Sequence, residues 1–276
     1  MKQLKENHSK ELIGLFPEYR WNYIADSILE GYMGQVLVDD QESPNVVALT
    51  LPEQKIHILG GDAGHAAARD YLAGLKGFSM LLTGSLGWKE LLDEVHPGKI
   101  ITLKRYAFNG DSLDIEHLKK LASGLSDDFW IVRIDLKHAQ KIMAEKNEMT
   151  EDQMFGFNSA EEFLASGFGF VALEGETIVC IASTGAVCSK GIEVQINTHK
   201  KYRGRGLASA VGAALIIEAL ENGIDPNWDA ATEISAGLAE KLGYTSKGEY
   251  DFYFYTGSKF LVSLRNFLRR IRGKEI

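Results

Sequence analysis

A loop with two glycines lies between an apolar segment, residues 191–198, and a helical stretch that continues to about Asn222. Gly204 and Gly206 let the backbone turn sharply and bring consecutive N–H groups to one point. The positive end of the following helix lies at the same point, so the loop can attract a diphosphate. Glycine-rich turns also occur in ordinary strand-to-helix connections, and the loop alone leaves both interpretations open.

The segments after the loop make the diphosphate interpretation more specific. The sequence predicts a short strand over residues 228–231, a helix that ends in Leu-Gly-aromatic at residues 242–244, and a final strand. This order resembles the GNAT family of coenzyme A-dependent N-acetyltransferases. The family's loop motif is Gln or Arg, two residues, Gly, one residue, and Gly or Ala. Here it falls on Lys201, Gly204 and Gly206, with lysine as a departure at the first position.

The resemblance carries expectations about fold and co-substrate. It implies an α/β (α+β) fold with a mixed, mostly antiparallel sheet flanked by helices, and acetyl-CoA as co-substrate without a metal. Residues 197–206 and 226–231 also resemble one bacterial branch of the family, which includes the zwittermicin A resistance acetyltransferase.

Other phosphate and hydrolase motifs fit the sequence less well. A dinucleotide fingerprint needs a third glycine where Ser209 stands, and no Gly-x-x-x-x-Gly-Lys-Ser/Thr sequence occurs. Ser85 has Thr83 where a Gly-x-Ser-x-Gly nucleophile motif needs its first glycine. The sequence therefore argues against a dehydrogenase, a nucleoside triphosphatase and a serine hydrolase.

Composition limits the class of partner. The 276 residues, 45% hydrophobic and 25% charged, are typical of a globular protein long enough for two domains. A formal net charge of −8 argues against nucleic acid as a partner, because a phosphate-binding surface needs clustered Lys and Arg. An acidic body suits a cationic small substrate, although the same acidity is common among cytoplasmic proteins.

The cysteines, the histidines and the lengths of the apolar runs bear on disulfides, metal sites and cellular location. Cys180 and Cys188 are the only cysteines and make no disulfide framework. The seven histidines lack paired i, i+4 spacing, so we expect no metal site. Neither a signal peptide nor an apolar run of membrane-spanning length is found, and we expect a cytoplasmic protein without an integral membrane segment.

The first half of the chain repeats the element order of the second. Residues 34–51 are typical of a hairpin, residues 55–59 predict a third strand, and a glycine loop, helix, strand, helix and strand follow. We therefore predict two tandem GNAT-like units, residues 1–128 and residues 129–276. Asp62 lies where a diphosphate would have to sit, so we expect the first unit to be degenerate and to bind no cofactor. Any other small α/β domain is the alternative.

The resemblance assigns the coenzyme A site to the second unit. In this family the strand before the loop separates from its neighbour, and its exposed amides bind the pantetheine arm. The loop and the helix start bind the diphosphate, and an asparagine that is replaced here by Thr232 begins the last helix. The residues implied in cofactor binding are Ile196, Asn197, Thr198, Lys201, Arg203, Gly204, Arg205, Gly206, Leu207, Ala208 and Thr232.

Two residues are candidates for proton transfer. Many family members carry a catalytic glutamate at the position of Glu193, where a partly buried carboxylate could accept the proton of an ammonium substrate. Pairing with a cation or facing solvent is the alternative role for Glu193. The family's thiolate-protonating tyrosine is replaced by Ala239. Tyr253 on the closing strand is a substitute, although an aromatic residue in a strand is more often part of the core.

The C-terminal segment, residues 259–276, predicts a basic amphipathic helix. Phe260, Leu264 and Phe267 lie at helical spacing, with lysine and arginine between them. Such a helix can contact an anionic surface or a partner, and more often packs its apolar stripe on its own protein.

These observations favour an N-acetyltransferase. The predicted reaction moves the acetyl group of acetyl-CoA to a primary amine of a small cationic acceptor in a direct ternary complex. A non-catalytic acyl-CoA-binding sensor or scaffold is the alternative, because the standard tyrosine is missing and the first unit is degenerate. A third possibility keeps the enzyme and makes a protein amino group the acceptor. A homodimer is compatible with each of these hypotheses.

Overall fold

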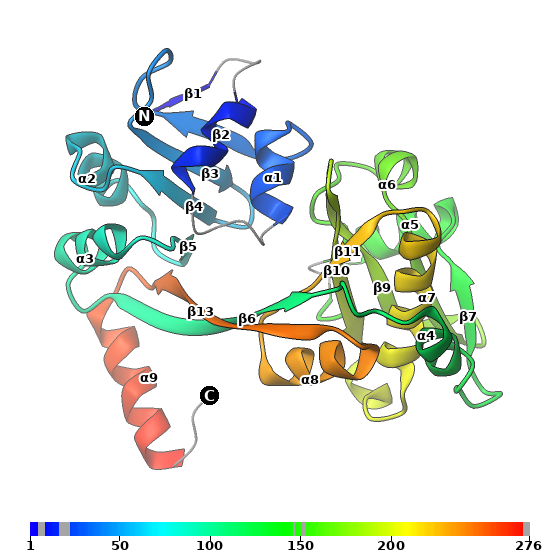
Figure 1. Ribbon diagram of the computed structural model, residues 1–276. Helices are drawn as coiled ribbons and strands as arrows, with labels where there is room; N and C mark the ends of the chain where they lie inside the picture. Colours follow the sequence, from blue (N-terminus) through cyan, green and yellow to red (C-terminus); the bar gives the residue numbers. More distant parts are fainter. Residues whose placement is uncertain (5–8, 17–22, 146, 151–152, 273–276) are drawn as a thin grey trace. The chain divides into compact units, whose positions relative to one another are not determined.

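The computed structural model describes residues 1–4, 9–16, 23–145, 147–150 and 153–272, which form two compact units (Figure 1). Unit 1 comprises Met1–Arg20, Ile28–Lys104 and Tyr250–Ile276, and unit 2 comprises Trp21–Ser27 and Arg105–Glu249. No helix in the described parts of the chain is long and apolar enough to cross a bilayer.

Unit 1 is built on a mixed sheet with the strand order β1-β2-β3-β4-β5-β13. The pairs are antiparallel except for β4 with β5, which is parallel. Trp88, Leu72 and Tyr253 belong to the buried core of this unit. The strands are β1 (Lys2–Gln3), β2 (Gln35–Val38), β3 (Val46–Leu51), β4 (Ile56–Gly61), β5 (Ser79–Leu82) and the end of β13 (Thr245–Tyr255). The helices are a 3₁₀ turn (Ser9–Leu15), α1 (Tyr23–Leu29), whose first residues belong to unit 2, α2 (Ala66–Ala73), α3 (Leu86–Val95) and α9 (Lys259–Arg272).

Unit 2 contains a five-stranded sheet with the order β11-β10-β9-β8-β7, in which only β10 and β11 are parallel. One hydrophobic cluster includes residues of α7, and another includes residues of α5 and α6. The strands are β7 (Trp130–Arg133), β8 (Gly169–Glu174), β9 (Thr177–Cys188), β10 (Gly191–Thr198) and β11 (Asp225–Asn227). The helices are α4 (Ile115–Ala122), α5 (Leu136–Ala144), α6 (Ala160–Ser166), a 3₁₀ turn (Lys200–Tyr202), α7 (Leu207–Glu221) and α8 (Glu233–Leu242).

The two units repeat one topology, which confirms the predicted fold class. In each, two antiparallel hairpin strands lead to a third antiparallel strand, β4 or β10, which is followed by a loop, a helix and a parallel neighbour. The mixed, mostly antiparallel sheets and their flanking helices correspond to the expected tandem arrangement. The strand predicted over residues 228–231 is found as β12 (Asp229–Ala230), and Trp228 separates it from a further strand, β11, which precedes the predicted range.

The division of the chain differs from the expected boundary between residues 128 and 129. The closing strand of the second half, β13, pairs in unit 1 with β5, where Tyr253 is opposite Leu81. The closing strand of the first half, β6 (Ile100–Asn109), pairs in unit 2 with β12, where Ala107 is opposite Asp229. Each half therefore completes the other. A strand pattern shows that a segment is extended but does not identify its partner, because any unpaired strand edge offers the same backbone groups.

Candidate functional site

The glycine loop of unit 2 has the backbone conformation that only glycine adopts readily. Gly204 has φ +79° and Gly206 has φ +82°, both in the left-handed region. A Cβ added at either residue would meet no atom within 4 Å, so the space beside the loop is open. The glycines are needed for the turn itself, and not to relieve crowding by neighbouring protein atoms.

Helix α7 begins at this loop without a side-chain cap. Gly206 is its N-cap residue, whereas α4, α5, α6 and α8 begin at capping side chains, Asp114, Asp135, Ser159 and Thr232. Within the described parts of the chain, the first N–H after the loop with a protein acceptor is that of Ala210, which donates to Gly206 O at 3.1 Å. Among the described residues, the preceding amides, from Gly204 onward, have no hydrogen bond to a protein acceptor. Together with the helix dipole they form a site for an anion.

Basic side chains surround this loop, and Tyr202 holds two of them. The guanidinium of Arg205 lies 5.3 Å and the Lys201 ammonium 5.5 Å from the Tyr202 ring centroid. Tyr202 is buried and donates its hydroxyl to Glu174 Oε2 at 2.5 Å, which fixes the ring. Arg203 turns back and donates from Nε to Thr198 O at 3.2 Å. The loop thus combines free amides with fixed positive charge.

The strand before the loop separates from its parallel neighbour. β10 pairs with β11 only through three residues and ends that pairing where Glu193 is opposite Asn227. From Val194 to Thr198, β10 pairs with β9 alone. Alternate N–H and C=O groups of Ile196, Asn197 and Thr198 therefore lack a strand partner on one side, which is the geometry expected for binding an amide-containing chain.

A β-bulge lies at the point of separation. Glu193 is opposite Ala186 and Val194 is opposite Thr184, so Gly185 is the extra residue on β9. Bulges of this kind bend a strand and redirect its side chains. The residue at which the redirection begins is the candidate base, Glu193.

Glu193 is buried among polar partners. Its side chain is 5% exposed and accepts a hydrogen bond at 2.7 Å from Asn227 Nδ2. Arg105 Nε lies 3.1 Å from Asp229 Oδ2, and both belong to the electrostatic surroundings of Glu193. Burial and, after it, the Asp229 carboxylate raise the pKa of Glu193 well above its ordinary value, against the opposing effects of Asn227 and Arg105.

This environment suits a general base better than a solvent-facing carboxylate. A glutamate with a raised pKa exchanges protons in a range closer to neutral pH, where an amine must lose its proton before it attacks a thioester. Asn227 and Asp229 lie within residues 226–231, which were noted for their resemblance to one bacterial branch of the family and not for a role beside Glu193. Arg105 lies 124 residues before Asp229 in the chain, and no local pattern indicated it.

A second polar group lies along the same strands. Gln195 is opposite Ser183 across the β9–β10 pair, and Ser183 donates to Gln153 Oε1 at 2.7 Å. Gln153 is 5% exposed, and its Nε2 has no hydrogen-bond partner among the described residues. Further along β10, Asn197 donates to the Glu148 carbonyl at 2.8 Å. These groups can orient a polar substrate beside Glu193.

The catalytic role of Tyr253 stays a prediction. Tyr253 lies in unit 1, is 5% exposed and belongs to the hydrophobic core with Trp88, whereas Glu193 lies in unit 2. This is the packing role that the sequence left open for a strand aromatic. Ala239, at the position of the family's tyrosine, is fully buried in unit 2. Thr232 caps α8 by accepting the Ser235 N–H at 3.2 Å, and no polar contact between described residues joins it to the loop.

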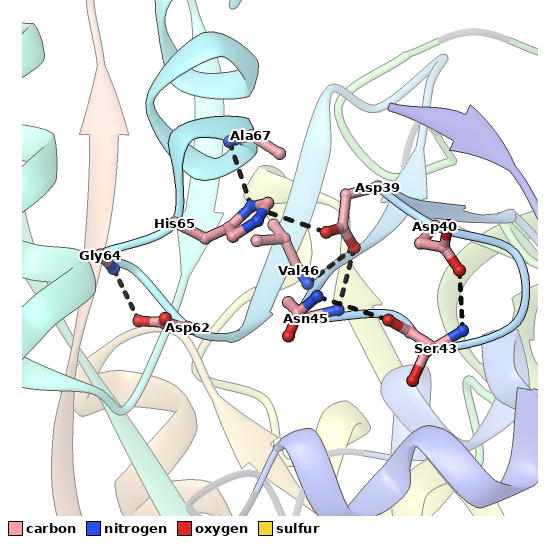
Figure 2. A network of polar contacts seen from close by, with 9 residues as sticks. All are labelled: Asp39, Asp40, Ser43, Asn45, Val46, Asp62, Gly64, His65 and Ala67. Carbon is pink, nitrogen blue, oxygen red and sulfur yellow. Dashed lines mark hydrogen bonds and ion pairs between the residues drawn. The ribbon is translucent and has the colours of Figure 1, made fainter.

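The corresponding loop of unit 1 uses its own side chains to occupy its amides (Figure 2). Asp62 Oδ1 accepts the Gly64 N–H at 2.8 Å, and His65 Nδ1 caps α2 by accepting the Ala67 N–H at 3.3 Å. His65 also lies 3.6 Å from Asp39 Oδ2. A Cβ at Gly61 would lie 2.0 Å from the Asn45 carbonyl oxygen, so the neighbouring hairpin closes this side of the loop.

Asp39 ties that hairpin together. Its Oδ1 accepts the N–H groups of Asn45 at 3.0 Å and of Val46 at 2.9 Å. Burial alone would raise the pKa of Asp39, but these amide hydrogen bonds outweigh it and lower the pKa below its ordinary value. The carboxylate thus holds the β2–β3 hairpin, whose Asn45 carbonyl lies beside Gly61 of the loop.

The position of the candidate base also differs between the units. In unit 1 the third parallel pair of residues is Ile58 with Leu82. In unit 2 it is Glu193 with Asn227, so Ile58 corresponds to Glu193. Ile58 is fully buried. A Cβ at Gly60, which corresponds to Gln195, would lie 2.4 Å from the Phe16 ring, so an apolar ring covers that face. At these positions, the described residues of unit 1 supply neither a carboxylate nor the polar partners found around Glu193.

No group of three potential metal-ligating side chains occurs among the residues that the structure describes. Near the glycine loop and β10, the described residues of unit 2 offer backbone amides, basic side chains and a buried carboxyl group.

Comparison with known proteins gives one consistent result. Residues 15–253 match the sequence model of the GNAT acetyltransferase family. The chain is 29% identical over 231 residues to the uncharacterized N-acetyltransferase YdfB of Bacillus subtilis, covering 80% of this chain and 85% of that protein. A GCN5-related N-acetyltransferase-like protein from Streptococcus suis has 33% identity and a TM-score of 0.79, covering 90% of this chain and 98% of the other. A GCN5-related N-acetyltransferase from Kribbella flavida has the same fold, with 15% identity, a TM-score of 0.59, and coverage of 87% and 96%. The resemblance to the zwittermicin A resistance branch stays a prediction.

Proposed function

Because the chain belongs to the GNAT acetyltransferase family, we propose that unit 2 moves the acetyl group of acetyl-CoA to a primary amine of a small, cationic acceptor. The observation that carries this proposal is the position of Glu193. It is a buried carboxyl group with a raised pKa, located at the bulge where β10 leaves β11 and on the strand that leads into the open glycine loop.

Acetyl-CoA fits the loop by the chemistry of its donors. The amides of Gly204, Arg205, Gly206, Leu207 and Ala208 supply hydrogen bonds and helix charge for a diphosphate, and the side chains of Lys201 and Arg205 add positive charge. The Arg203 amide, also expected at this site, donates to Lys200 O at 3.4 Å. The edge of β10 at Ile196, Asn197 and Thr198 supplies backbone groups for the amides of the pantetheine arm. Bound there, acetyl-CoA provides the activated acyl group.

Glu193 then accepts the proton that a protonated amine must lose. Asn227 orients the carboxylate through its hydrogen bond, and Asp229 keeps its pKa raised, while Arg105 neutralises Asp229. We expect direct transfer in a ternary complex, because the two described cysteines, Cys180 and Cys188, are buried, and burial raises the pKa of the Cys180 thiol to about 12. A thiol in that state is a poor nucleophile for an acyl-enzyme step.

The acceptor class follows from charge and hydrogen-bonding groups. Glu193, Asp229 and the body's net charge of −8 favour a cation. The Gln153 amide, with its free Nε2, supplies a donor for a hydroxyl or carbonyl oxygen of the same molecule. Aminopolyols and amino sugars combine these features, whereas simple polyamines lack the oxygen.

A thiol-release assay with acetyl-CoA and a panel of amines tests this function. The panel contains amino sugars, aminopolyols, polyamines and lysine-containing peptides. We expect turnover with the first two classes and reduced turnover of the same compounds in Gln153→Leu. Turnover confined to peptides would replace the small-molecule acceptor with a protein one. Tight acetyl-CoA binding without turnover of any amine would favour the sensor alternative.

A further inference from the structure

The last helix, α9, has no role in the acetyl-transfer site described above. It begins at Lys259, directly after a turn that is firmly attached to unit 1. Thr256 is 4% exposed, its N–H and its hydroxyl both donate to the Lys99 carbonyl at 3.0 Å, and Oγ1 accepts the Ser258 N–H at 3.1 Å. The base of the helix is therefore fixed, whatever the rest of the helix contacts.

The sequence of α9 separates apolar and basic residues. Phe260, Leu264, Phe267, Leu268 and Ile271 recur at the three- and four-residue spacing of one helical face. Between these residues the sequence has Lys259, Arg265, Arg269, Arg270 and Arg272, together with Leu261 and Val262, which are half-buried, and no acidic residue occurs from Gly257 to Lys274. In a chain with a net charge of −8, this is a local concentration of positive charge.

The described part of the apolar face is open to solvent. Phe260 is 71% exposed and Leu264 is 40% exposed, and no side chain from Lys259 to Asn266 is buried. The expected packing of this stripe on the protein is therefore not found for these residues. A phenylalanine this exposed on a helix with further apolar residues on the same face indicates a surface that binds something else.

The helix also lies outside the part shared with the family. The family match ends at residue 253, six residues before α9 begins. With 14 residues, the helix is about 21 Å long, which is too short for the bilayer core, and its five cations oppose insertion. A basic amphipathic helix of this length is suited to lie in the plane of a membrane surface.

We propose that α9 is an interfacial helix that binds anionic lipid bilayers through Phe260, Leu264 and the arginines that flank its apolar stripe. Charge complementarity favours lipid: the cations match anionic headgroups, while the stripe inserts among the acyl chains. The acidic body is repelled by the same surface, so the helix determines which part of the protein makes contact. This proposal does not depend on the acetyl-transfer reaction.

Cosedimentation of the full-length protein with vesicles tests the proposal. We expect binding to vesicles of 30% phosphatidylglycerol in phosphatidylcholine, little binding to pure phosphatidylcholine, and release by high salt. Phe260→Ser with Leu264→Ser, and separately Arg269→Glu with Arg270→Glu, should each lower the partition coefficient by about tenfold or more. Equal binding to both kinds of vesicle, or none to either, would overturn the proposal.

Matched variants separate α9 from general surface effects. Ile234→Ser with Trp130→Ser removes two apolar side chains that are 88% and 54% exposed in unit 2. Lys119→Glu with Lys120→Glu reverses two adjacent charges on α4. Both controls should bind vesicles like the parent protein, and an equal loss in either would contradict the assignment to α9. A lipid-free dimer that Arg269→Glu with Arg270→Glu dissociates would show instead that the stripe joins two copies.

Discussion

The loops at the starts of α2 and α7 occupy the same place in a repeated topology, yet only one is left open. In unit 1 the loop amides are occupied by Asp62 and His65, and the Asn45 carbonyl closes one side. In unit 2 two left-handed glycines lead into an uncapped helix with open space beside it. The same backbone topology thus becomes a closed turn or an anion site through a few side chains.

The third parallel-paired position of each unit shows the same contrast. Unit 2 has Glu193 opposite Asn227, and unit 1 has Ile58 opposite Leu82. One strand end carries the buried carboxyl group that we propose as the base, and the other carries a buried isoleucine. Function therefore resides in the site and not in the repeated fold, and the following variants test that separation.

The largest effect is expected for Glu193→Gln. The amide keeps the size and hydrogen-bonding reach of the side chain but has no basicity. Turnover should fall by about a hundredfold or more while acetyl-CoA affinity stays nearly constant. Initial rates and calorimetric titration measure the two quantities. Glu218→Gln makes the same change at a residue of α7 that forms an ion pair with Arg133, and it should leave turnover unchanged. Unchanged turnover of Glu193→Gln from pH 6 to pH 9 would eliminate the base role.

The raised pKa of Glu193 also predicts a pH-dependent stability difference. A carboxyl group with a raised folded-state pKa binds its proton more tightly when folded. Its contribution is present below the unfolded value of about 4.3 and is lost as pH rises through the raised value. Denaturant unfolding should show that the parent loses stability relative to Glu193→Gln over this rise in pH. A constant difference between the two proteins would show that the pKa of Glu193 is not raised in the folded state.

Gly204→Val should have the next largest effect. The side chain enters the open space beside the loop and forces a left-handed residue to change conformation, so acetyl-CoA affinity should fall by about tenfold or more. Gly223→Val is the matched control, because Gly223 has φ +69° and open surroundings at the other end of α7. Calorimetry on both variants decides the point. Equal affinity in the two would exclude the loop as the cofactor site.

Asp39→Ala tests how unit 1 closes its loop. Removing the carboxylate leaves the amides of Asn45 and Val46 without their acceptor, which should lower the free energy of unfolding by about 1–3 kcal/mol. The pKa of Asp39 is lower in the folded than in the unfolded protein. The carboxylate therefore stabilises the fold at pH values above the unfolded-state pKa, and this stabilisation is lost as the pH falls through the folded-state pKa. The difference between parent and variant should therefore shrink in acid. A difference that grows in acid would contradict the amide-binding role.

The smallest effect is expected for Asp62→Asn. If unit 1 is silent because several features close it, removing one charge should leave the acetyl-CoA stoichiometry at one site per chain. Calorimetry should give the same affinity and stoichiometry as the parent. A second binding site in this variant would show that a single aspartate keeps unit 1 empty.

The sequence by itself determined the local features of this protein. Two glycines separated by one residue fixed the left-handed turns at Gly204 and Gly206, and the element order fixed two similar halves. These follow from backbone sterics and hydrophobic periodicity, which act over a few residues. The identity of the loop and the position of Glu193 on β10 followed from the same short-range patterns.

Only the tertiary structure decided which distant residues meet. It placed Arg105 beside Asp229 and Tyr253 in the core of unit 1, because β6 and β13 each pair within the other half's unit. It also showed that His65 and Asp62 occupy their own loop, a result of side-chain direction and not of residue type. Strand edges offer identical backbone groups, so pairing partners depend on the packing of the whole chain. The raised pKa of Glu193 depends on that packing, since burial is its largest cause.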